Sequence, residues 1–201
     1  MKNHRDNWVN SVRMLLAMLL FVMLAFAGSA MPENATTGPY MVSFDLNTSL
    51  NYSIHSGAPV QESVRTAYPL LIATNNSSQA QITIFAYKDP VDSTPALWQT
   101  INSQGLSRLG LRNITLAEMV IDGMPAYGLA GQDGANRTLY SAYYWLDSKD
   151  CECGPVSVGN TNVVITSSYP LNLTGNLLDY LHVEKNQAGS QEAISFAPPN
   201  A

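Results

Sequence analysis

The sequence is poor in the residues that most enzymes use for catalysis. It has three histidines and two cysteines in 201 residues. It contains no G-x-S-x-G, no H-E-x-x-H, no P-loop, and no G-x-G-x-x-G after a strand pattern, which are the local signatures of several hydrolase and nucleotide-binding classes. A Ser-His-Asp set stays open, because its members can be far apart in sequence. These scarcities favour a non-catalytic protein, and no residue pattern predicts a cofactor.

Positive charge is also scarce. Lysine and arginine total 10, aspartate and glutamate total 15, and the formal net charge is −5. Without residues 1–30, which hold three of the basic residues and one acidic residue, 7 basic residues stand against 14 acidic ones and the net charge becomes −7. A strongly acidic chain disfavours nucleic acid and anionic membranes as partners.

Only one long apolar run is present, and it lies at the N-terminus. Lys2, Arg5 and Arg13 precede the uncharged residues 14–27, and small residues follow at 28–30. This order of basic, apolar and small residues is typical of a secretory signal peptide. The alternative is an uncleaved anchor, although the run is shorter than the ~20 apolar residues of a spanning helix. We therefore expect an exported protein that meets the membrane only through residues 1–30, if at all.

The motif N-x-S/T occurs eight times, which supports export independently. Random placement of 17 Asn and 32 Ser or Thr in 201 residues would give about three such motifs. The alternative is that a chain rich in these residues forms the motif freely. We predict N-glycosylation at the surface, provided the host has the machinery, with candidate sites at Asn34, Asn47, Asn51, Asn75, Asn76, Asn113, Asn136 and Asn172.

The strongest local structural signal is residues 113–130. Two apolar alternating stretches flank Asp122-Gly123, and Asp-Gly between such stretches predicts a β-hairpin, because a type I′ turn needs positive φ at both central residues. On the first strand, Thr115, Ala117, Met119 and Ile121 fall on one face. We expect this hairpin to be the centre of the fold.

Other alternating segments predict further strands, at residues 40–46, 51–55, 67–74, 81–87, 137–147 and 161–168. Two helices are expected. One opens at Thr94-Pro95 with Leu97, Trp98, Ile101 and Leu109 near one face, and the other follows Pro170 and carries Leu177, Leu178 and Leu181. Residues 31–39 are interpreted as a polar lead-in, residues 40–185 as a single domain, and residues 186–201 as a disordered tail. The fold class predicted is α+β: an antiparallel sheet covered by two helices in a layered sandwich.

In this order of elements the chain resembles the PsbP-like superfamily. The resemblance runs from about Tyr40 to Val183 and rests on the opening YMVSFDL strand, the QITIFAY strand before a helix, the IDGMPAY hairpin, the VVITSSYP strand and the terminal LLDYLHV helix. It implies a fold of PsbP-like type. No functional residue is carried over, because none of these features is a functional motif.

Cys151 and Cys153 lie together in a loop rich in Gly, Pro and charge. Three interpretations compete: a strained and easily reduced disulfide, a thiolate metal site with Asp150 and Glu152 as accessory ligands, and free or intermolecular thiols. The sequence therefore supports two functional hypotheses. The first is a non-catalytic exported domain that binds or assembles with a protein or cell-envelope partner. The second is a redox or metal-handling protein that uses the Cys151-Glu152-Cys153 loop.

Overall fold

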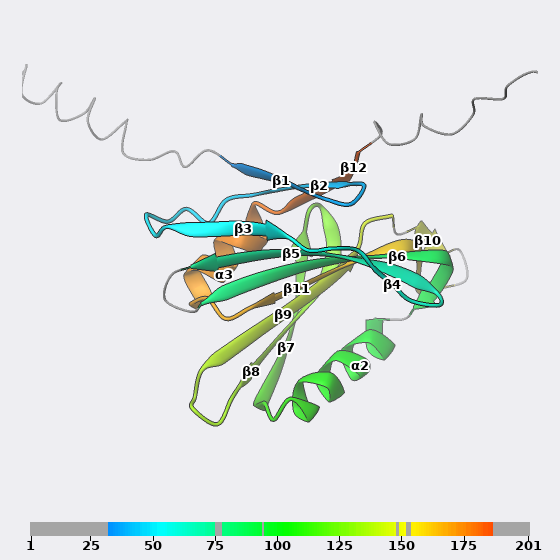
Figure 1. Ribbon diagram of the computed structural model, residues 1–201. Coiled ribbons are helices and arrows are strands. Elements are labelled where there is room, and N and C mark those ends of the chain that lie inside the picture. The colour runs from blue at the N-terminus through cyan, green and yellow to red at the C-terminus, as the bar shows by residue number, and fades with distance from the viewer. Residues whose placement is uncertain (1–31, 75–77, 94, 148, 152–153, 187–201) are drawn as a thin grey trace, which may run out of the picture. The chain divides into compact units, whose positions relative to one another are not determined.

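The computed structural model describes residues 32–74, 78–93, 95–147, 149–151 and 154–186 (Figure 1). Most of this part of the chain is strand. The strands are β1 (Glu33–Thr37), β2 (Tyr40–Phe44), β3 (Tyr52–Ser56), β4 (Val60–Gln61), β5 (Arg65–Thr74), β6 (Gln79–Ser93), β7 (Arg112–Ile121), β8 (Met124–Gln132), β9 (Thr138–Trp145), β10 (Lys149–Cys151), β11 (Gly154–Ser167) and β12 (His182–Lys185). The helices are α2 (Pro95–Arg108) and α3 (Leu171–Asp179).

Nine strands form one large antiparallel sheet. Its main order is β3-β5-β6-β11-β9-β8-β7, with β4 paired to β5 and β10 paired to β11. At its centre, β6 continues through Asp89-Pro90, and its register with β11 shifts between Gly159 and Thr161. A β-bulge is a place where a sheet tolerates proline. The Asp147 carboxylate accepts hydrogen bonds from the backbone N–H groups of Asn160 and Thr161 at this bulge.

A second, three-stranded sheet joins segments from opposite ends of the described chain. Its order is β1-β2-β12, so the second strand pairs with the last one. β1 lies within the stretch predicted to be a polar lead-in, and Asn186 donates its backbone N–H to the Pro39 oxygen at 2.7 Å. The small sheet contributes Tyr40, Val42, Phe44 and Val183 to the main core.

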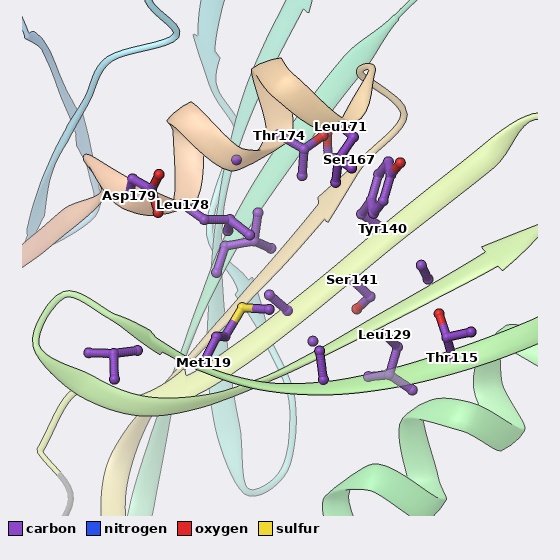
Figure 2. A pocket seen from close by; sticks show the side chains of 17 residues that line it. Thr115, Met119, Leu129, Tyr140, Ser141, Ser167, Leu171, Thr174, Leu178 and Asp179 are labelled. Carbon is purple, nitrogen blue, oxygen red and sulfur yellow. The ribbon is translucent and has the colours of Figure 1, made fainter.

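The two faces of the large sheet are covered differently. One face packs against the small sheet and α3, and we call it the α3 face; its core includes Leu70, Ile82, Ile165 and the α3 residue Leu177. The other face packs against α2, and we call it the α2 face. Its smaller cluster of buried residues consists of Leu106, Leu111, Leu129 and Tyr143. Figure 2 shows α3 on one side of the strands and α2 on the other.

The predicted fold class was wrong. Over the residues that the structure describes, the protein is mainly β, with two antiparallel sheets and two short helices, and it is not a single sheet covered by helices in a layered α+β sandwich. Three residues of the predicted apolar stripe of α2, Leu97, Ile101 and Leu109, are exposed, and Leu106 is buried instead. The side chain of Trp98, the fourth, lies outside the described part of the structure. The helix continues past Gly105 to Arg108, and Gly110, with φ of 81°, follows its end.

The predicted hairpin is confirmed. Ile121 pairs with Met124 across Asp122 and Gly123, whose φ angles are 55° and 72°. Positive φ at both central residues is the mark of the type I′ turn. However, β7 ends the strand order, so the hairpin lies at the edge of the large sheet and not at its centre.

Candidate functional site

An apolar groove of about 330 Å³ lies between α3 and strands β7, β8, β9 and β11 on the α3 face (Figure 2). The floor of the groove results from the way in which residues of β7, β8 and β9 pair with one another. Ala117 is opposite Gly128, and Gly128 is opposite Ala142, so three adjacent strands present almost no side chain at this level. Residues directly opposite one another share a face of the sheet. The groove is therefore a hollow made by small residues in one row.

Larger side chains form the walls of the groove. Figure 2 shows Leu178 extending from α3 toward the sheet and Met119 extending from β7. A Cβ atom added at Gly128 would lie 2.4 Å from the Met119 Cε, so the Met119 side chain lies over this glycine. At Gly175 of α3, which also lines the groove, an added Cβ would meet nothing within 4 Å. The groove therefore has free space at the helix and a movable thioether at the sheet.

Two buried hydroxyl groups beside the groove, those of Ser167 and Thr174, already have partners. Ser167 Oγ and Thr174 Oγ1 lie 2.8 Å apart, and Thr174 Oγ1 donates to the Tyr169 oxygen. The Tyr169 N–H donates to Ser167 Oγ at 3.1 Å. These bonds fasten the start of α3 to the end of β11, in place of a side-chain cap at Pro170. They satisfy the polar groups that a ligand would otherwise have to satisfy.

Titratable groups are rare in the groove. Among its described lining residues, Asp179 at the end of α3 supplies the one carboxylate, and no histidine, cysteine, lysine or arginine is present. General acid–base and nucleophilic catalysis need such groups within hydrogen-bonding reach of the reacting atoms. A concave site of this size with mostly apolar walls is suited to binding.

Asp122 has a second role beyond the hairpin turn. Its carboxylate accepts hydrogen bonds from Tyr144 Oη at 3.2 Å, His182 Nδ1 at 2.6 Å and the Val183 backbone N–H at 2.9 Å. It therefore fastens the β7–β8 turn to β12 of the small sheet. Sequence reasoning missed this role, because Asp-Gly is explained by the turn alone and His182 is 60 residues away.

The electrostatics of this contact follow from its geometry. The hydrogen bond to the Asp122 carboxylate raises the pKa of His182, against a smaller opposing effect of burial, and Asp122 and Glu184 also favour the charged imidazolium. Burial raises the pKa of Tyr144, and the charge of Asp122 adds to the effect. Tyr144, His182 and the Val183 N–H all bond to the Asp122 carboxylate, which joins the two sheets. The cluster therefore fits a structural role.

A larger hollow, of about 640 Å³, borders the β8–β9 turn and the start of α3. Its charged residues, Asp133 and Arg137, form an ion pair of 2.8 Å with each other. The Asp133 carboxylate also accepts the backbone N–H groups of Ala135 and Arg137. These contacts stabilise the turn, and the hollow brings no catalytic set together among the described residues.

Six of the eight predicted glycosylation sites lie in the described residues, and all six side chains are exposed: Asn34, Asn47, Asn51, Asn113, Asn136 and Asn172. Three of them, Asn47, Asn113 and Asn136, have φ between 45° and 58°. Asparagine tolerates this left-handed region better than most residues, so local backbone geometry also explains its use there. Glycosylation itself stays a prediction. Asn75 and Asn76 lie outside the described residues.

The remaining predictions fall largely outside the described residues. Cys153 is one of these, and for Cys151 the structure describes only the backbone, which pairs with Gly154. The disulfide and the metal alternative at Cys151 and Cys153 therefore stay predictions. The signal peptide at residues 1–30 and the tail from 187 onward also lie outside. Within the described ranges, no group of three or more His, Cys, Asp or Glu could hold a metal ion, and no helix is long and apolar enough to cross a membrane.

Comparison with known proteins returned no relative. No family model matches the chain, and no curated protein or solved structure is similar to it at the significance required. The resemblance to the PsbP-like superfamily thus stays a prediction from the order of sequence features.

Proposed function

We propose that this chain is a non-catalytic exported domain whose groove on the α3 face binds an apolar part of a protein or cell-envelope partner. The observation that carries the proposal is the 330 Å³ groove with its floor of Ala117, Gly128 and Ala142. Burial of apolar surface contributes about 25 cal/mol per Å². A groove of this composition therefore favours a ligand through its apolar surface, while the hydroxyl groups of Ser167 and Thr174 are bonded within the fold.

Export is the part of the proposal that rests on sequence. The basic, apolar and small-residue order of residues 1–30 and the eight N-x-S/T motifs support it. The exposed positions of the six described asparagines are compatible with carbohydrate at the surface. The acidic net charge supports a partner other than nucleic acid.

A neutral apolar dye tests the groove without knowledge of the natural partner. Titration of the protein with Nile red should show saturable fluorescence enhancement at one site. Gly175→Leu should reduce the affinity by about tenfold or more, because the new side chain enters the free space beside α3. Leucine also favours a helix more than glycine does, so the variant should remain folded.

The matched control is Gly105→Leu. Gly105 is likewise a helical glycine with nothing within 4 Å of an added Cβ, but it belongs to α2 and does not line the groove. Dye affinity should be unchanged in this variant. Equal dye binding by the parent and Gly175→Leu would contradict the proposal, as would loss of binding in both variants.

A further inference from the structure

The outer edge of the large sheet at β7 is uncovered over a long stretch. β7 has ten residues and pairs only with β8 among the described strands, whereas the strand at the opposite edge, β3, has five residues. Proteins normally protect sheet edges with short strands, proline, lysine or bulges. β7 contains no proline or lysine, and its one register shift lies at its start, between Arg112 and Thr115.

The hairpin geometry shows which backbone groups of β7 face outward. The type I′ turn places the Ile121 carbonyl and the Met124 N–H in a hydrogen bond, and along an antiparallel pair bonded and non-bonded residues alternate. Met119 and Ala117 therefore bond to β8. The N–H and C=O groups of Leu116, Glu118 and Val120 point away from β8, toward the open edge.

The same three residues carry exposed side chains on the α2 face. Leu116 is 55% exposed and Val120 is 69% exposed. Glu118 lies midway between them and is also exposed. The edge thus presents free backbone groups together with the side-chain order apolar, acidic, apolar. An added strand would gain affinity from hydrogen bonds to these backbone groups and selectivity from the alternating side chains.

The charge of Glu118 indicates which kind of strand fits. If a second copy paired its own β7 here with Leu116 against Val120, the two Glu118 carboxylates would lie directly opposite each other, because Glu118 is the midpoint. Like charges in opposite positions destabilise a strand pair, and opposite charges stabilise it. The chain beyond residue 30 also carries an excess of seven negative charges.

We infer that β7 is a docking edge at which an extended basic segment of another protein adds as a further antiparallel strand, with a lysine or arginine opposite Glu118 and apolar residues opposite Leu116 and Val120. The segment would have the order apolar-x-basic-x-apolar. The exposed side chains of this edge project on the α2 face, whereas the groove opens on the α3 face, and Val120 borders both. Glu118 does not line the groove, so Glu118→Lys should change peptide preference and leave dye binding unchanged, which tests the edge independently of the groove's ligand.

A fluorescein-labelled peptide, acetyl-TVTKTLT-amide, is the probe. Fluorescence polarisation should show saturable binding to the parent, weaker by about three- to tenfold when glutamate replaces the peptide lysine. Glu118→Lys should reverse this preference. Glu184→Lys is the matched control, because Glu184 is an exposed glutamate on another edge strand, β12, and should leave the preference unchanged.

Val120→Pro tests the backbone contribution. Proline at this position removes an N–H that does not bond to β8, so the hairpin ladder stays intact while peptide binding should be lost. A thermal melt close to that of the parent would show that the fold is retained. The inference is overturned if the parent shows no saturable binding, if Glu118→Lys leaves the peptide preference unchanged, or if sedimentation shows that parent β7 is already taken up in a dimer that Val120→Pro dissolves.

Discussion

The two faces of the large sheet differ in what covers them. The α3 face is covered by a second sheet and by a helix of nine residues, and it holds the main core. The α2 face receives a longer helix, of 14 residues, yet its buried cluster is small. The short helix contributes the fully buried Leu177, whereas the long one exposes Leu97 and Ile101. Among the side chains that the structure describes, the shorter helix therefore contributes more to the core, because Leu177 of α3 lies between two layers whereas Leu97 and Ile101 of α2 face solvent.

The largest difference between the two faces is expected in the free energy of unfolding that is lost when one apolar side chain on each face is shortened to alanine. Leu177→Ala should lower the free energy of unfolding by about 2–5 kcal/mol, because it leaves a cavity in the main core. Ile101→Ala should change it by less than about 1 kcal/mol, because Ile101 is 48% exposed. Urea denaturation of both variants measures the two values. Similar losses would show that the α2 face is packed as well as the α3 face.

A smaller effect is expected from the turn that fastens the β7–β8 hairpin to the small sheet. Gly123→Val should destabilise the fold by about 1–3 kcal/mol, because Gly123 has φ of 72° and a β-branched residue resists that conformation. An added Cβ there would meet nothing within 4 Å, so the cost is one of backbone conformation. The control is Gly134→Val, at an open turn position without positive φ. An unchanged melting temperature for Gly123→Val would contradict the turn's role.

The His182–Asp122 contact should make the α3 face sensitive to pH by a still smaller amount. The pKa of His182 is raised by its hydrogen bond to Asp122, so its stabilising contribution is fully present below the ordinary value of about 6.5 and is lost as pH rises through the raised pKa. His182 is 57% exposed, so solvent screening limits the contribution to about 0.5–1 kcal/mol.

Melting temperatures of the parent and His182→Gln between pH 5 and 9 check this expectation. The advantage of the parent should shrink above pH 6.5. His55→Gln is the control, because the His55 ring bonds to Ser53 and not to a carboxylate. A constant difference between the parent and His182→Gln over this range would rule out titration of the contact.

The smallest change in stability is expected on replacing the cysteines. This replacement tests whether the stability of the protein comes from its two packed faces or from a crosslink. The double variant Cys151→Ser, Cys153→Ser should melt almost as the parent does, because a bond between residues two apart closes a very small loop. Mass spectrometry of the non-reduced protein should show the local disulfide. Two free thiols, a dimer linked through this loop, or stoichiometric copper or zinc that the double variant loses would each refute it.

The parts of the fold that the sequence predicted are local ones. Asp122-Gly123 between alternating strands specifies its turn whatever surrounds it, and the segments at residues 67–74 and 81–87 alternate because one face is buried. The second sheet escaped prediction for a physical reason: β1 is polar and exposed over most of its length, and its partners are β2 and, through β2, the distant β12. A pairing between residues such as Val42 and Val183 leaves no local pattern.

The groove was beyond prediction for a related reason. Ala117, Gly128 and Ala142 are ordinary small strand residues, and they form a floor only because three registers align them. Asp122 was identified as a turn residue, but its contact with His182 depends on how two sheets meet. The sequence did divide β7 into two faces: Ala117, Met119 and Ile121 share one of them, on which Ile121 is buried and the other two line the groove.

The placement of β12 sets an order on the formation of the structure. This strand is the last of those described, and it pairs with β2, near the other end of the chain. A chain still being synthesised therefore holds β2 with one side open and with Tyr40, Val42 and Phe44 lacking part of their cover. Contacts so distant in sequence form slowly, because a long loop must close first. Until β12 pairs with β2, the unpaired edge of β2 is accessible to chaperones and proteases. Pairing of β12 removes this exposed edge and completes the small sheet.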